Sequence, residues 1–240
     1  MTLPSILRSR VALAALLACA AAAHAERVDV TVDAAMPWVG FVNLFERPAG
    51  AADRGARVDG FFLNTDLAAL PASIAGSQAM LAPNGTLGGA PRDGTDWWIA
   101  DGKGGHLPNR VIEANVYVDT GFSGVALGGK TVRFSGTTLA SSLAAPYVAY
   151  AFIRDFLPGY QSGYTESSVA LVAGQAFELT LDTVLGHPVQ YGFALVGPNA
   201  DPAALGSLGS ITISAVPEPA TPAMLLLGAA ALLGWMRRQR

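Results

Sequence analysis

The chain has 240 residues, of which 51% are hydrophobic and 14% charged, and its formal net charge is −3. Between the apolar segments at its two ends, residues 26–215 carry 10 basic and 17 acidic side chains, a net charge of −7. An acidic surface repels phosphate backbones, so the composition argues against nucleic-acid binding. Because the single cysteine, Cys19, lies in the first apolar segment, internal disulfides, cysteine nucleophiles and thiolate metal sites are excluded from residues 26–215.

The first 25 residues have the parts of a secretory signal peptide. Arg8 and Arg10 precede an apolar run over residues 11–18, and a small-x-small site ends at Ala25. The pattern predicts cleavage after residue 25 and export of the remainder. The alternatives are a buried first helix and lipidation at Cys19.

Residues 26–214 are short apolar segments separated by glycine, proline, asparagine and aspartate, without a sustained helical period. Residues 112–118 alternate strictly, which predicts a strand with one buried face and one solvated face that carries Glu113, Asn115 and Tyr117. Strands are expected at 28–32, 38–45, 58–63, 96–100, 112–118, 131–137, 147–153, 177–181, 189–196 and 210–214.

Two of these segments, 147–153 and 189–196, are apolar on both faces, which predicts central strands covered on both sides. A helical turn is expected over 201–205, and long loops over 84–94 and 102–105. Many short strands with turns between them indicate an all-β fold, an antiparallel β-sandwich of jelly-roll type, as the domain of residues 26–214.

The stretch 92–109 is the densest in groups that bind ligands. An exposed indole beside carboxylates suits a sugar, because its C–H-rich face packs on the ring while its hydroxyls pair with acids. The alternative is structural, with one indole in the core, the other over an edge, and the aspartates in turns. The candidate ligand-binding residues here are Asp93, Asp96, Trp97, Trp98 and Asp101.

The same aspartates offer oxygen ligands to calcium, although their spacing differs from that of a calcium loop. No other metal or cofactor is expected, because the chain has no dinucleotide-binding or phosphate-binding glycine loop.

A second cluster follows the expected central strand, where Arg154 and Asp155 precede Phe156, Tyr160 and Tyr164. Exposed tyrosines on a loop bind glycans, and Tyr160 is a further candidate. Tyrosines near strand ends also cap the core while the hydroxyl stays in water, and this alternative remains open.

Catalytic signals are sparse. A glycosidase needs two carboxylates on either side of the scissile bond, and Glu113, Glu166 and Glu178 are available, although Glu113 and Glu178 fall on faces expected to be solvated. No Gly-x-Ser-x-Gly elbow is present. His106 and His187 are too few for a histidine-rich metal centre.

A proline-rich linker over 215–222 leads to a C-terminal apolar helix and basic tail over 223–240. A helix over 219–236 would be about 27 Å long, just sufficient to cross the ~30 Å hydrocarbon core of a bilayer. Arg237 and Arg238 would stay on the cytoplasmic side, so the tail is expected to hold the exported domain at the membrane.

This order of parts resembles the sorting tail of PEP-CTERM proteins, which are secreted substrates of exosortases in Gram-negative bacteria that make exopolysaccharide. The match consists of Val216, Pro217, Glu218, Pro219 and Ala220, the apolar run 225–233 and the terminal arginines, including Arg237 and Arg238. The resemblance implies membrane anchoring, processing by an exosortase-like peptidase near Pro217–Pro219, and release to the cell surface or the extracellular matrix.

The leading hypothesis is therefore a non-enzymatic, exported β-sandwich protein with exopolysaccharide as its expected partner. The alternatives are a polysaccharide hydrolase with a carboxylate pair near the glycine-rich loops, and an inert structural or adhesive coat protein.

Overall fold

The computed structural model describes residues 25–47, 54–161 and 163–215. Three expected segments lie outside these ranges: the signal peptide except for residue 25, the linker with the Pro217–Pro219 motif except for residue 215, and the sorting helix with its arginines. Among the described residues, no helix is both long enough and apolar enough to cross a membrane.

Sheet I has six strands in the order β11-β10-β13-β8-β2-β3, and every neighbouring pair is antiparallel. Its four inner strands, β10, β13, β8 and β2, have nine or ten residues each and are rich in valine, isoleucine and aromatic side chains. The strands are β2 (Trp38–Glu46), β3 (Arg57–Asn64), β8 (Arg110–Asp119), β10 (Val148–Phe156), β11 (Tyr164–Ala170) and β13 (Val189–Pro198).

Sheet II follows the order β1-β9-β14-β5-β4, and β12 also pairs with β9. The strands are β1 (Arg27–Val30), β4 (Ala72–Ala75), β5 (Gln78–Leu81), β9 (Thr131–Ser141), β12 (Ala176–Asp182) and β14 (Ile211–Ser214). This sheet is mixed, because β1 runs parallel to β9. The expectation of a wholly antiparallel fold was therefore wrong at β1, because alternation along one strand does not encode the direction of its neighbour.

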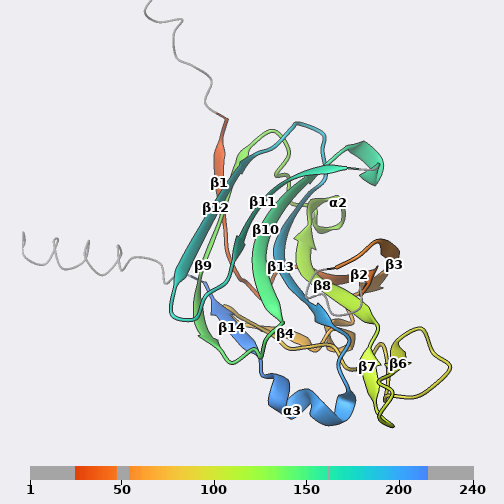
Figure 1. Cartoon of the computed structure of the whole chain (residues 1–240). Helices are drawn as coiled ribbons and strands as arrows, with labels where there is room; N and C mark the ends of the chain where they lie inside the picture. The colour runs from red at the N-terminus through yellow and green to blue at the C-terminus, as the bar shows by residue number, and fades with distance from the viewer. Residues whose placement is uncertain (1–24, 48–53, 162, 216–240) are drawn as a thin grey trace, which may run out of the picture.

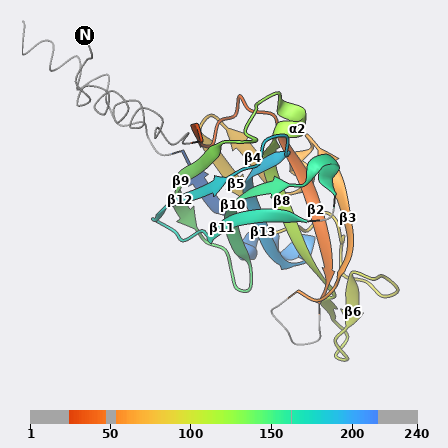
Figure 2. The same ribbon diagram turned by 90° about the horizontal axis from the view of Figure 1, so that it is seen from above.

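The two sheets form the layers of a sandwich (Figure 1), and from above β9 and β12 lie on one side of the molecule and β2 and β3 on the other (Figure 2). The core between them contains the inward residues of both sheets, among them Val116, Val132 and Ile213. A cluster of rings lies at its centre, where Trp38 stacks on Phe193 with centroids 6.1 Å apart. Burial of this apolar surface is the main stabilising term for the fold.

Short elements connect the sheets. The β6 (Trp98–Ala100) and β7 (His106–Pro108) hairpin projects from one end of the molecule (Figure 1). The expected turn over 201–205 is confirmed as η3 (Pro202–Ala204), which runs into α3 (Leu205–Leu208), with Asp201 Oδ1 accepting from Ala203 N at 2.9 Å. The remaining short helices are η1 (Leu67–Ala69), α2 (Thr120–Ser123) and η2 (Pro158–Tyr160).

The two expected doubly covered strands correspond to β10 and β13, and both are buried on both faces over most of their length. The same holds for β8, where the sequence predicted a solvated face. Glu113, Asn115 and Tyr117 are 5%, 1% and 4% exposed, so this expectation was wrong. The outer face of sheet I carries its own packed layer, in which Tyr117 and Phe152 contact Val39 and Ala194.

Candidate binding cleft on sheet I

The outer face of sheet I is built by the outward-pointing residues of its long inner strands. Tyr117 on β8 lies opposite Gly192 on β13. A Cβ atom at Gly192 would lie 2.2 Å from the Val116 carbonyl oxygen and 2.8 Å from Tyr117 Cβ, so only glycine allows this close approach. The pKa of the Tyr117 hydroxyl is raised, chiefly because the side chain is buried.

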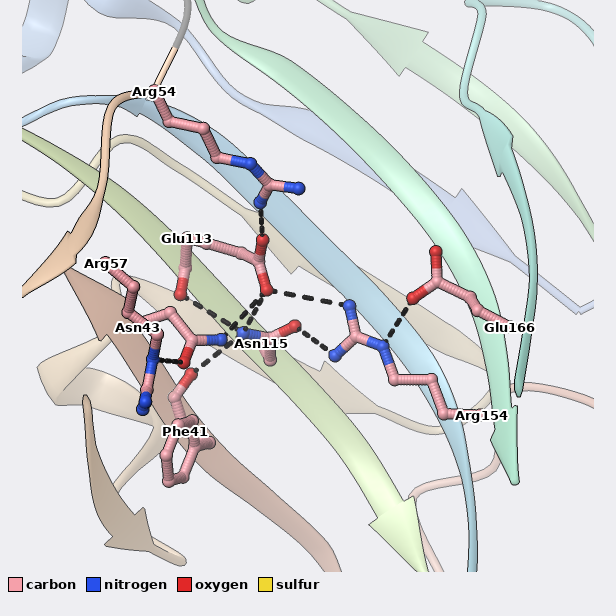
Figure 3. A network of polar contacts seen from close by, with 8 residues as sticks. All are labelled: Phe41, Asn43, Arg54, Arg57, Glu113, Asn115, Arg154 and Glu166. Carbon is pink, nitrogen blue, oxygen red and sulfur yellow. Dashed lines mark hydrogen bonds and ion pairs between the residues drawn. The ribbon is translucent and has the colours of Figure 1, made fainter. Parts of the chain in front are cut away.

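Arg154 on β10 is the centre of a polar network on this face (Figure 3). Its Nε donates to Glu166 Oε2 at 2.6 Å, and its Nη1 donates to Asn115 Oδ1 at 2.8 Å. Its Nη2 lies 3.5 Å from Glu113 Oε1. The guanidinium also lies over the Phe152 ring, 3.9 Å from the centroid. Three strands, β8, β10 and β11, thus meet at one arginine.

Glu113 is the second centre of the network. Its Oε1 accepts from Asn43 Nδ2 at 3.0 Å and from Asn115 Nδ2 at 3.2 Å, and its Oε2 pairs with Arg54. Arg57 Nε then donates to Asn43 Oδ1 at 2.9 Å. Buried charges are tolerated only when hydrogen bonds satisfy them, and here each carboxylate oxygen of Glu113 has a donor.

Two cavities, of about 440 and 450 Å³, lie against this network, and both are lined by Arg154 and Tyr164. Together they form what we call the cleft. The first is lined by Glu113 and Glu166. The second is lined by polar residues of the sheet and by aromatic residues: Phe41, Phe62, Tyr117, Phe122, Phe156, Tyr160, Asn43, Arg57, Asn115, Asp119 and Gln190.

Five of the rings form a continuous series, the aromatic row, which consists of Phe62, Phe122, Tyr160, Phe156 and Tyr164. Successive centroids along the row lie 6.0, 6.3, 5.6 and 4.9 Å apart, and the Phe122 and Tyr160 planes differ by only 9°. The row connects β3, α2, η2, β10 and β11, so segments distant in sequence build one edge of the cleft.

Asp119, which is 1% exposed, holds two members of the row in place. Its Oδ1 accepts from Gly121 N at 2.7 Å, which caps α2 and so positions Phe122, and from the Tyr160 hydroxyl at 2.5 Å. Its Oδ2 accepts from Gln190 Nε2 at 2.7 Å. Burial first, and then the bond to this carboxylate, raise the pKa of Tyr160.

The candidates in the stretch 92–109 lie around the β6–β7 hairpin rather than in the cleft. Trp98 is 4% exposed and donates from Nε1 to Gly88 O at 3.2 Å, while Trp97 is half-buried against the main core. Trp97 also precedes β6, which begins at Trp98, so the two indoles do not alternate along one strand as expected. Neither indole is exposed, and sugar binding at this pair remains only a prediction.

The three aspartates of that stretch serve separate contacts. Asp93 Oδ1 lies 3.0 Å from His106 Nε2, and Asp96 is exposed. Asp101 Oδ1 accepts from Lys103 N at 2.7 Å and from Gly105 N at 2.8 Å, and these two bonds lower the pKa of Asp101. Within the described part of the chain, no three His, Cys, Asp or Glu side chains gather closely enough to hold a metal ion, which gives no support to calcium binding by these aspartates.

Tyr160 is the one of the six candidate ligand-binding residues that lines the cleft. Sequence reasoning did not place Asp119 or Gln190 in a site, and it assigned Glu113 to a solvated face. A signal was present: a charged residue, Arg154, directly follows a segment predicted to be covered on both faces, and such a charge requires buried partners.

A scan against protein-family models matches residues 215–240 to the PEP-CTERM protein-sorting motif. The match includes Pro217, Glu218, Pro219, Arg237 and Arg238, the residues in which the sequence predicted a sorting and processing signal. Neither the comparison with curated proteins nor the comparison with solved structures gives a match. The chain therefore ends in a PEP-CTERM protein-sorting motif, which indicates a bacterial protein that an exosortase-type system sorts for export to the cell surface or the extracellular space.

Proposed function

We propose that this protein is a non-enzymatic component of the bacterial surface or extracellular matrix, including biofilm, that associates with exopolysaccharide through the cleft on sheet I. The observation that carries the proposal is the combination, in one cleft, of an aromatic row with a hydrogen-bonded polar floor. Sugars have apolar ring faces and polar edges, and sites that bind them supply both surfaces.

The roles of the carboxylates support binding rather than hydrolysis. A glycosidase needs one carboxyl group to donate a proton to the leaving oxygen and a second to act as nucleophile or base. In the first cavity, Glu166 accepts from Arg154, and Glu113 forms an ion pair with Arg154 at 3.5 Å and also accepts from Arg54 and Asn43. Both carboxylate oxygens of Glu113 therefore have donors, and Glu166 Oε2 is held by Arg154, which disfavours Glu113 as a proton donor or base.

A polysaccharide hydrolase is the second candidate, and one observation favours it: Glu113 and Glu166 line the same cavity. This pair lies on sheet I rather than near the glycine-rich loops, where the sequence placed it.

Incubation of the purified chain with exopolysaccharide from its host separates the two candidates. We expect co-sedimentation without release of reducing ends. The control variant is Glu178→Gln, which changes an exposed carboxylate on β12. If the native chain and this control release reducing ends and Glu113→Gln does not, the hydrolase is established instead. No association at all would overturn both candidates.

We further propose that residues 223–240 hold the exported domain at the membrane until processing near Pro217–Pro219. The short apolar tail and the arginines that follow it support this proposal. Mass spectrometry of the mature protein is expected to show a C-terminus close to Pro219, and a mature chain that still ends at Arg240 would contradict it.

The finer fold assignment, a jelly-roll type of sandwich, is also a proposal. It is supported by the repeated passage of the chain from one sheet to the other, as between β8, β9 and β10.

A further inference from the structure

The exposed aromatic side chains of this protein are gathered in one place. Among the described residues, every exposed large aromatic side chain belongs to the aromatic row: Phe62, Phe122, Tyr160 and Tyr164 are 47%, 67%, 39% and 50% exposed. Isolated exposed apolar side chains are common, but a contiguous series of rings beside a cavity indicates a binding surface.

The row is fixed before any ligand arrives. Tyr160 has a positive φ of 55°, which a tyrosine adopts only at an energetic cost, and its hydroxyl is held by the buried Asp119. The same carboxylate caps α2 and so fixes the segment that carries Phe122, whose ring is stacked on that of Tyr160. A platform positioned in this way loses little conformational entropy on binding.

The floor beside the row is polar and carries charges of both signs, Arg57 and Arg154 with the buried Asp119, all of them hydrogen-bonded. Arg154 is paired with Glu113 and Glu166, and Arg54 is paired with Glu113. Gln190 uses one amide N–H for Asp119, and its amide has a second N–H and a carbonyl oxygen. The floor therefore offers hydrogen bonds without a large excess of charge.

We infer that the aromatic row and the 450 Å³ cavity beside it bind the pyranose rings of a neutral polysaccharide, an inference that rests on the proposed function and specifies its ligand class. The C–H faces of the sugar pack on the rings of Phe122, Tyr160 and Tyr164, and its hydroxyls reach Gln190 and Asn43, which also line the cavity. The volume lies within the range of about 300–1,000 Å³ typical of small-ligand sites.

The chemistry of the cleft disfavours other occupants. An acyl chain would cover the polar groups of Gln190, Asn43 and Arg57 without offering them hydrogen bonds, which costs free energy. An acidic sugar would bring its carboxylate toward the buried Asp119, where like charges repel, while the cations that line the cavity, Arg57 and Arg154, already bond Asn43 and Glu166. A neutral sugar meets neither penalty.

Affinity electrophoresis of the full chain tests the inference. The gels contain laminarin, dextran or galactomannan as neutral probes, alginate as an acidic probe, or the exopolysaccharide of the host. The variants are Phe122→Ala and Tyr164→Ala. The matched control is Leu139→Ala, since Leu139 on β9 is 48% exposed but belongs to sheet II. Unchanged far-UV circular dichroism and an unchanged Tm establish that each variant is folded, and Phe62→Ala replaces any variant that is not.

We expect a neutral probe to retard the native chain and Leu139→Ala equally, at low and at high salt. Each ring variant is expected to bind roughly tenfold more weakly, as the loss of one stacked ring predicts. Retardation of the native chain and the ring variants alike would overturn the aromatic row as the site while leaving the association with exopolysaccharide itself intact. Retardation by alginate alone would overturn the neutral class. No retardation by any polysaccharide, including that of the host, would overturn the proposed function and this inference together.

Discussion

Arg154 is the residue on which the outer face of sheet I depends most. Its side chain is 10% exposed and connects Glu113, Asn115 and Glu166. Arg154→Met keeps the length of the side chain but leaves Glu113, itself 7% exposed at the side chain, without its central cation. We expect the free energy of unfolding to fall by about 3–5 kcal/mol, as measured by urea denaturation.

The control is Arg133→Met, which removes an arginine that pairs with the half-exposed Glu178 on the surface of sheet II. Surface pairs contribute little, so this variant should remain close to the native chain. Adding Glu113→Gln to Arg154→Met should recover part of the loss, because it removes a buried carboxylate that has lost one of its two cations. Equal losses for Arg154→Met and Arg133→Met would contradict a buried network.

Asp119 is the second residue on which the stability of the outer face of sheet I depends. Asp119→Ala removes the acceptor for Gly121 N, the Tyr160 hydroxyl and Gln190 Nε2. We expect a loss of about 1–3 kcal/mol in the free energy of unfolding, together with weaker protection of α2 amides in hydrogen exchange. Tyr160→Phe removes one of these bonds and should cost less. A larger loss for Tyr160→Phe would show that Asp119 is not the residue that holds α2 and Tyr160 in place.

At the scale of elements, the contact between β13 and β8 depends on Gly192. Because the atoms that a Cβ would meet include a main-chain oxygen at 2.2 Å, side-chain rotation cannot relieve the clash. Gly192→Ala should therefore destabilise the protein by about 1–3 kcal/mol in urea denaturation. Gly206→Ala in α3 meets no atom within 4 Å and is expected to be neutral or stabilising. Similar effects at the two glycines would contradict the register of sheet I.

Sequence patterns predicted the long inner strands well, because β2, β8, β10 and β13 are long and apolar on at least one face. They did not predict β4 or β5, which have four residues each, or β11, whose alternation of YTESSVA is largely polar. A period of two needs several apolar repeats before it exceeds chance, and these strands have too few.

The cleft was less predictable than the strands. Glu113, Arg154 and Glu166 meet only because β8, β13, β10 and β11 are neighbours, an order that no local pattern contains. Tyr160 could be proposed because tyrosines were clustered near one strand end. Phe62 and Phe122 could not, because nothing close to them in sequence marks them as members of the same row.

For the molecule as a whole, tyrosines with raised pKa values determine the pH above which the folded state loses stability. Burial raises the pKa of Tyr147 to about 12, and it also raises the pKa of Tyr117, Tyr160 and Tyr191. The unfolded chain therefore releases these protons at lower pH, near the ordinary tyrosine value of about 10. The contribution of these groups to stability is fully present below pH ~10 and is lost as pH rises through the folded values.

Urea midpoints measured between pH 8 and pH 12 should thus be flat below about 10 and decrease above it. Absorbance of tyrosinate in the folded protein should show groups that titrate late. Tyr147→Phe should remove one late group and flatten the alkaline decrease. Titration of Tyr117, Tyr147, Tyr160 and Tyr191 near pH ~10 in the folded chain would contradict their raised pKa values.

The position of β14 has a consequence for secretion. Residues 211–214 are the last described strand, yet β14 lies between β5 and β9 and pairs with both. A chain that leaves the cell from its N-terminus onward cannot close sheet II until almost all of it has crossed. Sheet II therefore closes only when residues 211–214 are free to pair, and these residues lie directly before the sorting motif that begins at residue 215.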